Sequence, residues 1–359
     1  MLVEQHQSIV RLAQSRGHQH LVKILQEKPV DVSASEERNL SFQAPNLSWD
    51  ISEAERRVLG RTTNIRKFIK NVSSLEARYG KPEVKVVVIH DGIDPTYEHP
   101  ITDGGSFCVP GMKGDNDFYD IGAMGTHTAS VIHDVCLGSM LYVARVGTEN
   151  GMDFSIDVVE WAINKRVNII SISGDIGQPE DSQRYQKFRD AITAAIQHGI
   201  SIFCSATNRM FQDLPFDVDG VFRITCFTSN DEDDDGDADF RLFVSRYGRG
   251  GYRTRFSKAV SIAQASGLAA LIMYYARLVD VEGPYHRFDR TIVCSPKTMR
   301  TAFVNLSRTS ESKLVIDVEA LFFDRVPLRS DEAKVAALQQ LLTCLTVPPG
   351  AESSTKQAS

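Results

Sequence analysis

From residue 84 onward, short continuous apolar runs alternate along the chain with amphipathic stretches of helical spacing. Short runs that are apolar on both faces are typical of strands buried inside a parallel sheet. Their alternation with helices predicts an α/β fold in which helices cover both faces of the sheet. The strand-like runs are 84–89, 140–146, 167–172 and 200–204, and the clearest helical stretches between them are 155–166 and 183–197.

The first 80 residues have a different pattern. Apolar positions at approximate helical spacing on either side of Gly17 predict two short helices. A polar connection follows, and residues 50–70 predict another helix, in which Ser52 and Glu55 match a capping box. This last helix is rich in Arg and Lys, which is typical of a solvated face; the alternative is a surface that binds an acidic partner or a membrane surface.

The C-terminal part continues the fold through residues 295–303 and 314–322 and then predicts a last helix over 333–342, which acidic residues at its start would favour. The end of the chain is rich in small polar residues and prolines and is predicted to be a disordered tail. The expected organisation is a helical N-terminal extension, an α/β domain, and a C-terminal helix with a tail. Their ranges are 1–80, 81–325 and 326–359.

Composition excludes several classes of protein. The 359 residues are 42% hydrophobic and 24% charged, which is typical of a globular protein, and the net charge of −6 argues against a nucleic-acid binder. The start lacks the pattern of a secretory signal, and no uninterrupted apolar stretch is long enough to span a membrane, so a cytoplasmic protein is expected. The six cysteines lack CxxC spacing, and we interpret them as buried free thiols.

In a parallel sheet, functional groups gather beyond the carboxyl ends of the strands. The first apolar run ends in the sequence HDGID from His90, and the third ends in SISG at Gly174. The fourth run is followed by SATN, which ends at Asn208. A helix is expected to begin at the sequence GTHTAS around His127, and residues 256–271 predict a long buried helix that is rich in small side chains.

These five blocks, in this order, resemble the subtilisin-like serine peptidases, or subtilases, in particular their fungal intracellular type. The resemblance covers residues 81–325. It implies a three-layer subtilisin-like fold with a mainly parallel central sheet and helices on both faces. In this family a strand-end acid orients a histidine, the histidine takes a proton from a serine at a helix start, and an asparagine helps to hold the oxyanion.

Part of that machinery is present. The resemblance places the catalytic histidine at His127 and the oxyanion asparagine at Asn208. It also places Ser171, Ser173 and Gly174 on the strand that pairs with an extended peptide substrate. No cofactor is implied.

Two catalytic positions are substituted. The catalytic acid aligns with His90, and Asp91 takes the next position; the nucleophile aligns with Ala259. A methyl group cannot attack a carbonyl, and in subtilisin itself, this family's namesake, loss of the serine costs about a millionfold in turnover. Asp91 is expected to project away from the acid position because side chains alternate along a strand. Ser257 and Ser261 are expected on the far side of the helix from Ala259.

Three interpretations stay open. The leading one is a catalytically degenerate subtilase that binds a peptide, a protein or a small molecule in the former active-site cleft. The second is an active serine endopeptidase whose nucleophile was replaced by Ala259. The third is a cleft that has been repurposed for a non-proteolytic reaction, with His127, His90 and Asp91 as acid and base.

Two histidines without a third ligand make a poor zinc site, so no metal is expected. The N-terminal helices are a candidate surface for a protein partner.

One further charged segment draws attention. In the acidic run 231–239, Asp231, Asp233, Asp235 and Gly236 fit positions of a calcium loop, but Leu242 stands where the loop needs a glutamate. The simplest interpretation is a solvated acidic loop that pairs with the arginines that follow it in the chain.

Overall fold

The fold is described from a computed structural model. The structure describes residues 63–108, 118–119, 124–146, 156–173, 182–206, 218–227, 238–243, 252–279, 295–310, 313–318, 320–322 and 330–345. These ranges contain all four predicted strand-like runs in full, whereas residues 1–62, with the predicted capping box, lie outside them.

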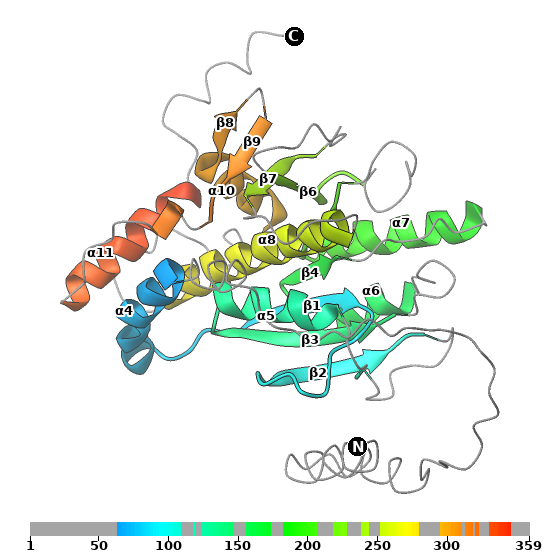
Figure 1. The fold of residues 1–359 in the computed structure, drawn as a ribbon, viewed down its shortest axis with the longest axis horizontal. Coiled ribbons are helices and arrows are strands. Elements are labelled where there is room, and N and C mark those ends of the chain that lie inside the picture. The colour runs from blue at the N-terminus through cyan, green and yellow to red at the C-terminus, as the bar shows by residue number, and fades with distance from the viewer. Residues whose placement is uncertain are drawn as a thin grey trace, which may run out of the picture. The chain divides into compact units, whose positions relative to one another are not determined.

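A nine-stranded sheet forms the centre of the domain, in the order β2-β3-β1-β4-β5-β6-β7-β9-β8. All neighbouring strands are parallel except β8 and β9 (Figure 1). The four predicted runs form β1, β3, β4 and β5, which confirms them. The strands are β1 (Val84–His90), β2 (Ile101–Ser106), β3 (Ser139–Arg145), β4 (Ile169–Ile172), β5 (Ser201–Ser205), β6 (Phe222–Phe227), β7 (Phe240–Phe243), β8 (Arg308–Ser310) and β9 (Lys313–Ile316).

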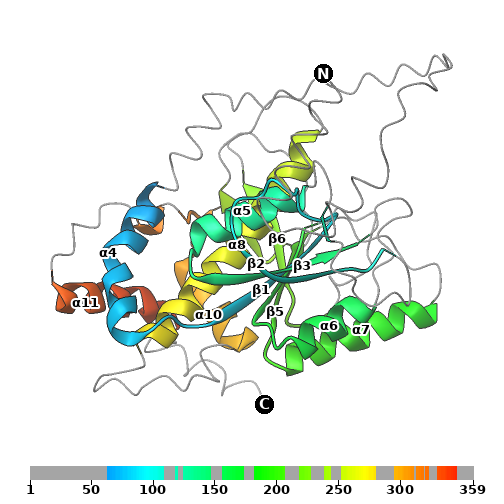
Figure 2. The ribbon, with the colours of Figure 1, turned by 90° about the horizontal axis from the view of Figure 1, so that it is seen from below.

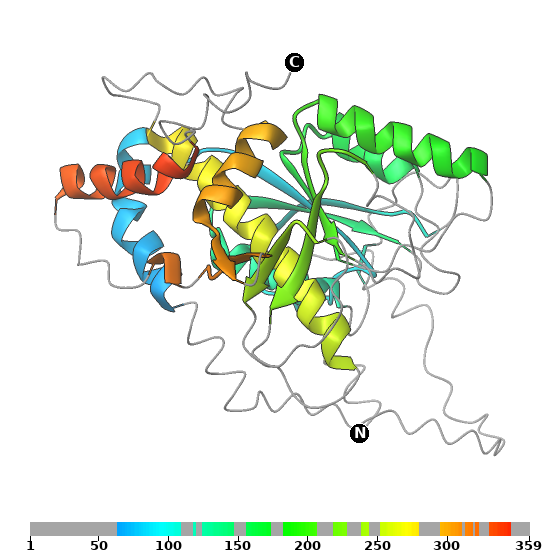
Figure 3. The same cartoon turned by 90° about the horizontal axis from the view of Figure 1, so that it is seen from above.

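Helices cover both faces of this sheet, as Figure 2 shows, with α5 and α8 on one side and α6 and α7 on the other. Figure 3 shows α6 and α7 side by side on their face. The result is a three-layer α/β arrangement. The α-helices are α4 (Thr63–Tyr79), α5 (Gly125–Val135), α6 (Ile156–Asn164), α7 (Ser182–Gln197), α8 (Tyr252–Val279), α10 (Pro296–Leu306) and α11 (Asp331–Leu342); short 3₁₀ turns are η1 (Ala320–Phe322) and η2 (Thr343–Leu345).

The central strands are buried on both sides because they carry apolar side chains in both directions. In β1, Val86 and Val88 belong to the core under α5 and α8, whereas Val87 and Ile89 belong to the core under α6 and α7. Full burial of such a side chain contributes roughly 1.5–3 kcal/mol. His90 is the last residue of β1 and stands at the edge of the sheet where α5 begins.

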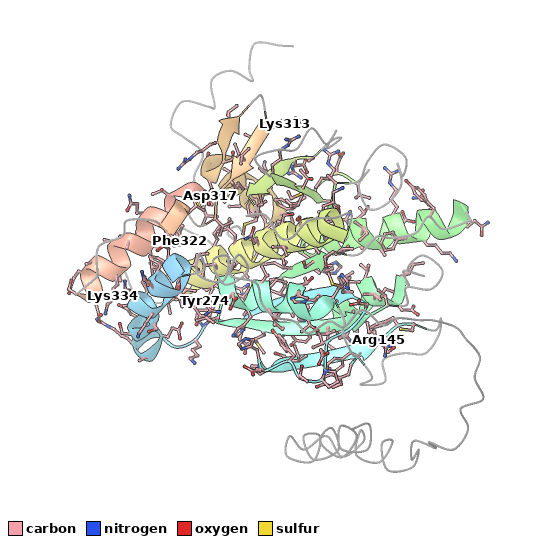
Figure 4. The ribbon with its side chains drawn as sticks, in the orientation of Figure 1. Arg145, Tyr274, Lys313, Asp317, Phe322 and Lys334 are labelled. Carbon is pink, nitrogen blue, oxygen red and sulfur yellow. The ribbon has the colours of Figure 1, made fainter. Side chains whose placement is uncertain are left out.

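Helix α4 lies in the segment that the sequence assigned to the N-terminal extension. It continues beyond the predicted end at residue 70 as far as Tyr79. Phe68 is buried and its ring lies 5.8 Å from that of Tyr275 and 5.1 Å from that of Phe322, which Figure 4 labels. Because α4 shares the core of the sheet, the described end of the predicted extension is part of the α/β domain's packing. The prediction drew the domain boundary C-terminal to this helix.

Helix α8 is the central helix of one layer. Its segment Ser257–Val279 is long and apolar enough to cross a membrane, but 94% of the most apolar window is buried within the protein. Gly267 lets α5 approach, since a Cβ there would lie 2.8 Å from Val135 Cβ. Burial inside the domain therefore accounts for the apolar character of α8.

Three helices that end at the amino edge of the sheet are followed by residues in the left-handed region. After α4 and α7 these are glycines, Gly80 with φ 84° and Gly199 with φ 79°. After α6 the position is held by Arg166, with φ 52°. A side chain in this region costs on the order of 1 kcal/mol relative to glycine.

The C-terminal helices predicted around 295–303 and over 333–342 are present as α10 and α11, whereas the predicted tail lies outside the described residues. Ser295 caps α10 by accepting from the Thr298 N–H at 3.1 Å, and Ser330 caps α11 by accepting from the Ala333 N–H at 3.2 Å. Both helices contribute buried side chains to the same core as α8, and α11 packs directly against α8. The cysteines of the described residues are free, and all of them are buried apart from the half-buried Cys108.

Candidate functional site

The candidate site lies where the carboxyl ends of β1, β3 and β4 meet the start of α5. The parallel register pairs His90 with Arg145, and Arg145 with Ser106 on the next strand. Paired residues of parallel strands point to the same face of the sheet. His90 and Arg145 are both half-buried and stand on the face that α5 covers, and Figure 4 labels Arg145 at this end of the sheet.

Asp91 ties β1 to the start of α5. Its carboxylate accepts from the backbone N–H groups of Met124 at 3.0 Å and of Gly125 at 2.9 Å. The same carboxylate lies 2.6 Å from Nδ1 of His90. Burial alone would raise the pKa of Asp91, but the hydrogen bond and positive charge of His90 and the two N–H donors lower it below its ordinary value. The carboxylate is therefore an anion held at a helix N-terminus.

This arrangement corrects the prediction that Asp91 projects away from the site. β1 ends at His90, so the alternation of side chains along a strand no longer governs the next residue. The turn brings the Asp91 carboxylate onto α5, two residues before His127.

Gly125 allows the close approach of α5 to the end of β1. A Cβ at this position would lie 2.2 Å from the Gly92 carbonyl oxygen and 3.1 Å from His90 Cβ. His127 lies in the first turn of α5, where its N–H donates to the Met124 carbonyl at 3.0 Å, and its side chain is half-buried. Thr126 Oγ1 accepts from the Asp94 N–H at 2.7 Å. The sheet end that carries His90 and the helix turn that carries His127 are thus in contact.

Only part of the predicted peptide-binding strand lies at this site. Ser173 Oγ lies 3.2 Å from Thr128 Oγ1, one residue after His127. Ser171, in contrast, is fully buried, and its strand is paired on both sides, with Val88 and with Phe203. A central strand has no free backbone edge, so Ser171 does not fit the predicted contact with an extended peptide. Gly174 and Asn208 lie outside the described residues.

The nucleophile position lies inside a helix. α8 begins at Tyr252, seven residues before Ala259, and Ala259 is 5% exposed. Ser261 is fully buried and its hydroxyl donates to the Ser257 carbonyl at 2.9 Å and to the Lys258 carbonyl at 3.0 Å. A hydroxyl bound to the backbone of its own helix is not poised to attack a substrate. The expectation that Ser257 and Ser261 do not replace the nucleophile fits these contacts.

Two side chains that the sequence reading missed stand at the site. Arg145 donates from a guanidinium nitrogen to the Tyr119 carbonyl at 3.0 Å. Thr128 is buried against Ser173. Arg145 could have been found, because it closes an apolar run that was read as a strand, and the strand-end rule applies to it as to His90. Thr128 carries no comparable signal.

The far end of α5 carries a second polar cluster. The rings of His99 and His133 stack with centroids 4.0 Å apart. Burial and the neighbouring His99 and Arg66 lower the pKa of His133 to about 4, although Asp134 acts in the opposite direction. Arg66 of α4 forms an ion pair with Asp134. These contacts fix α5 at the end opposite to His127.

No group of three or more metal-ligating side chains occurs within the described ranges. Most of the acidic run, including its calcium-like positions, lies outside them. Its last member, Asp239, pairs with Arg223 at 2.8 Å and with Arg300 at 3.3 Å. Neither partner belongs to the arginines that directly follow the run, so the predicted pairing is wrong for this residue. Asp239 links β6, β7 and α10.

A family model described as the subtilase family, Peptidase_S8, matches residues 115–310, more than half of the chain. The chain belongs to the subtilase family. The predicted three-layer, mainly parallel subtilisin-like fold is thereby confirmed. No curated protein matches this subtilase in sequence.

Solved structures similar to this subtilase include three proteases. A lanthipeptide protease is 16% identical, with a TM-score of 0.49 over 72% of this chain and 94% of that chain. The prenylagaramide maturation protease PagA is 16% identical, with a TM-score of 0.48 over 79% and 99%. The nisin leader peptidase NisP from Lactococcus lactis is 15% identical, with a TM-score of 0.46 over 71% and 92%.

Proposed function

We propose that this subtilase has lost serine peptidase chemistry and binds a peptide segment in the former active-site cleft. The observation that carries the proposal is the course of α8 through the nucleophile position. Serine catalysis needs a nucleophilic oxygen beside a histidine and backbone N–H groups free to hold the oxyanion. At Ala259 the side chain is a methyl group, and the backbone lies within a helix that began seven residues earlier.

The helical backbone matters as much as the missing oxygen. Within an α-helix each N–H donates to the carbonyl four residues before it, and only the first four N–H groups are free. The N–H of residue 259 comes after those four. An active endopeptidase whose only change is the replacement of its serine by Ala259 would keep the helix start at the nucleophile. The loss of catalysis therefore includes the backbone of this half of the site.

The residues at the acid position also support the loss of serine peptidase chemistry. His90 cannot supply the negative charge that orients and stabilises a histidine cation. The neighbouring Asp91 carboxylate is occupied by two N–H groups of α5 and by His90 itself. Asp91 thus serves as a helix cap and a partner of His90.

The ligand proposal rests on the parts of the cleft that remain. Ser173 stands at the end of β4, half-buried, against the turn of α5 that carries His127. The resemblance to the family places Ser173 on the strand that pairs with extended substrates, so a peptide is the ligand class we infer. The fungal type, the cytoplasmic location and a protein partner of the N-terminal helices stay predictions.

A second candidate function is proton transfer by His90 in a repurposed cleft. Its support is the His90–Asp91 pair, which are 12% and 24% exposed in their side chains. Nδ1 of His90 lies 2.6 Å from the Asp91 carboxylate and 2.8 Å from the Asp91 N–H, so it can donate to one or accept from the other. A carboxylate on Nδ1 leaves Nε2 as the atom that exchanges a proton with a ligand.

The test combines binding with cleavage. A library of fluorescent peptides is incubated with the purified full-length chain and with a Ser173→Trp variant, which obstructs the end of β4. We expect saturable binding without cleavage products for the unmodified chain, and binding at least tenfold weaker for the variant. A Lys313→Trp variant, changed on an exposed position of the distant strand β9, is the matched control and keeps full affinity.

Cleavage of the library by the unmodified chain, abolished by His127→Ala, would overturn the proposal. A His90→Asn variant separates the second candidate. If the cleft performs proton transfer, this variant loses turnover of the cleft ligand and keeps peptide affinity.

A further inference from the structure

A pocket opens at the amino edge of the sheet, opposite to the candidate site. It has a volume of about 820 Å³. Three of its lining residues, Glu83, Asn168 and Ile200, directly precede β1, β4 and β5. Because β1 runs from Val84 to His90, the two sites are roughly 20 Å apart at the strand rise of about 3.3 Å per residue. The pocket is thus separate from the cleft.

The chemistry of the lining is cationic over an apolar floor. Ile163 and Pro82, which are half-buried, supply apolar surface, and the nearly buried Val167 and Ile200 lie behind them in the lining. Lys81, Arg166 and Arg277 carry permanent positive charges, His198 is titratable, and Glu83 is the one carboxylate of the lining. A volume of this size with a few convergent charged groups fits a small-molecule ligand.

Two of the polar groups are fixed by the protein. The Arg277 guanidinium donates to the Glu83 carbonyl and lies 3.4 Å from Asn168 Oδ1. His198 Nδ1 lies 2.8 Å from the Ala194 carbonyl, which can only accept, so the proton is on Nδ1 and Nε2 is left for the pocket. Groups held in this way lose little freedom when a ligand binds.

Helix ends offer a simpler explanation for some of these charges. α4, α6 and α7 end at this edge, and cations near a helix C-terminus interact favourably with its last carbonyls. That explanation covers Lys81 and His198. It does not account for the arginine in the left-handed position after α6, where the other two helices have glycine. Any cation one or two residues away would serve the helix without a strained backbone.

We propose that this pocket binds a phosphorylated small molecule of nucleotide size, with Arg166 and Lys81 contacting the phosphate oxygens. Arginine matches phosphate geometry through paired N–H donors, and lysine adds a point charge. The apolar surface of Ile163 and Pro82 then faces the uncharged body of the ligand. On this account the backbone strain at Arg166 is retained because its side chain serves the ligand.

The experiment is isothermal titration calorimetry of the full-length chain with ADP, inorganic pyrophosphate and adenosine. We expect ADP to bind in the micromolar to low millimolar range, pyrophosphate more weakly, and adenosine at least tenfold more weakly than ADP. Arg166→Gly removes the side chain and relieves the backbone, so ADP affinity falls at least tenfold while the melting temperature does not fall. Lys81→Ala weakens ADP binding with no change in melting temperature.

Two controls keep this result independent of the cleft. His127→Ala leaves ADP affinity unchanged, and so does Lys313→Ala, which removes an exposed cation elsewhere. The proposal is overturned if neither ADP nor pyrophosphate binds at millimolar concentration. It is also overturned if adenosine binds as well as ADP, or if Arg166→Gly and Lys81→Ala both keep the affinity of the unmodified chain.

Discussion

The starts of α5 and α8 show how one half of a subtilase site can be kept while the other is lost. α5 begins at Gly125, two residues before His127, and its first N–H groups are held by the Asp91 carboxylate. α8 begins at Tyr252, seven residues before Ala259. The histidine half still lies at a helix start on the sheet edge, whereas the nucleophile half has become the interior of a core helix.

The difference teaches that the two halves are stabilised by different interactions. The start of α5 depends on hydrogen bonds from its first N–H groups to the Asp91 carboxylate. It also depends on Gly125, which leaves room for the backbone that follows β1. The corresponding part of α8 depends on burial, since Ala259, Val260 and Ala263 lie in the core. Small side chains pack in such a helix without any catalytic group, so the loss of the nucleophile carries no cost in stability.

The largest effect is expected for Gly125→Ala. The new Cβ would lie 2.2 Å from the Gly92 carbonyl oxygen, which is backbone and cannot move aside, so unfolding by urea should show a loss of about 3 kcal/mol or more. Gly267→Ala is the matched change on α8, where the nearest atom is Val135 Cβ at 2.8 Å. It should cost less, because this contact is 0.6 Å longer than the one at Gly125. Equal losses at the two positions would contradict the special role of Gly125.

Asp91→Ala removes the acceptor of two α5 N–H groups and should cost about 1–2 kcal/mol. Asp91→Asn keeps an acceptor and should cost less. The pKa of Asp91 is lowered in the folded state, so its stabilisation is present above the ordinary value of 3.8 and is lost as the pH falls through the folded pKa. Thermal unfolding between pH 6 and pH 2 should therefore show a smaller acid loss in Asp91→Ala than in the unmodified chain.

At the far end of α5, protonation of His133 should lower the stability at a less acidic pH than protonation of Asp91 does. The folded pKa of His133 is about 4 and its ordinary value 6.5, so the unfolded state binds a proton over this interval that the folded state does not. Stability then falls as the pH drops from 6.5 towards 4. The effect is on the order of 1 kcal/mol because the ring is partly exposed to solvent. His133→Gln should flatten the profile of melting temperature against pH in this window, and an unchanged profile would contradict the assignment.

The smallest effect is expected for Ala259→Ser. Within a helix the new hydroxyl can donate to the carbonyl one turn earlier, as Ser261 does to Ser257. Calorimetric unfolding should show a change of less than about 1 kcal/mol. A loss as large as that for Gly125→Ala would mean that residue 259 is not accommodated in a regular helix.

Sequence patterns predicted the sheet core and most helices, because strands that are buried on both faces, such as β1 and β4, are continuous apolar runs in the sequence. They missed β2, whose sequence ITDGGS is polar and glycine-rich, the strands β6 and β7, and the three-residue strand β8. At the site, His127 was placed correctly at a helix start. The contact of Asp91 with α5 depends on a turn after the strand, and the early start of α8 depends on packing, so neither follows from residue periodicity.

The most direct test of the central claim is covalent labelling at position 259. Ala259→Ser and the double variant Ala259→Ser with His90→Asp are incubated with a fluorophosphonate, and intact masses are measured. If α8 runs through this position, the new hydroxyl is buried and bound to its own helix, and neither variant gains the mass of the reagent. Stoichiometric labelling of position 259 in either variant, prevented by His127→Ala, would contradict the account and restore a working serine site.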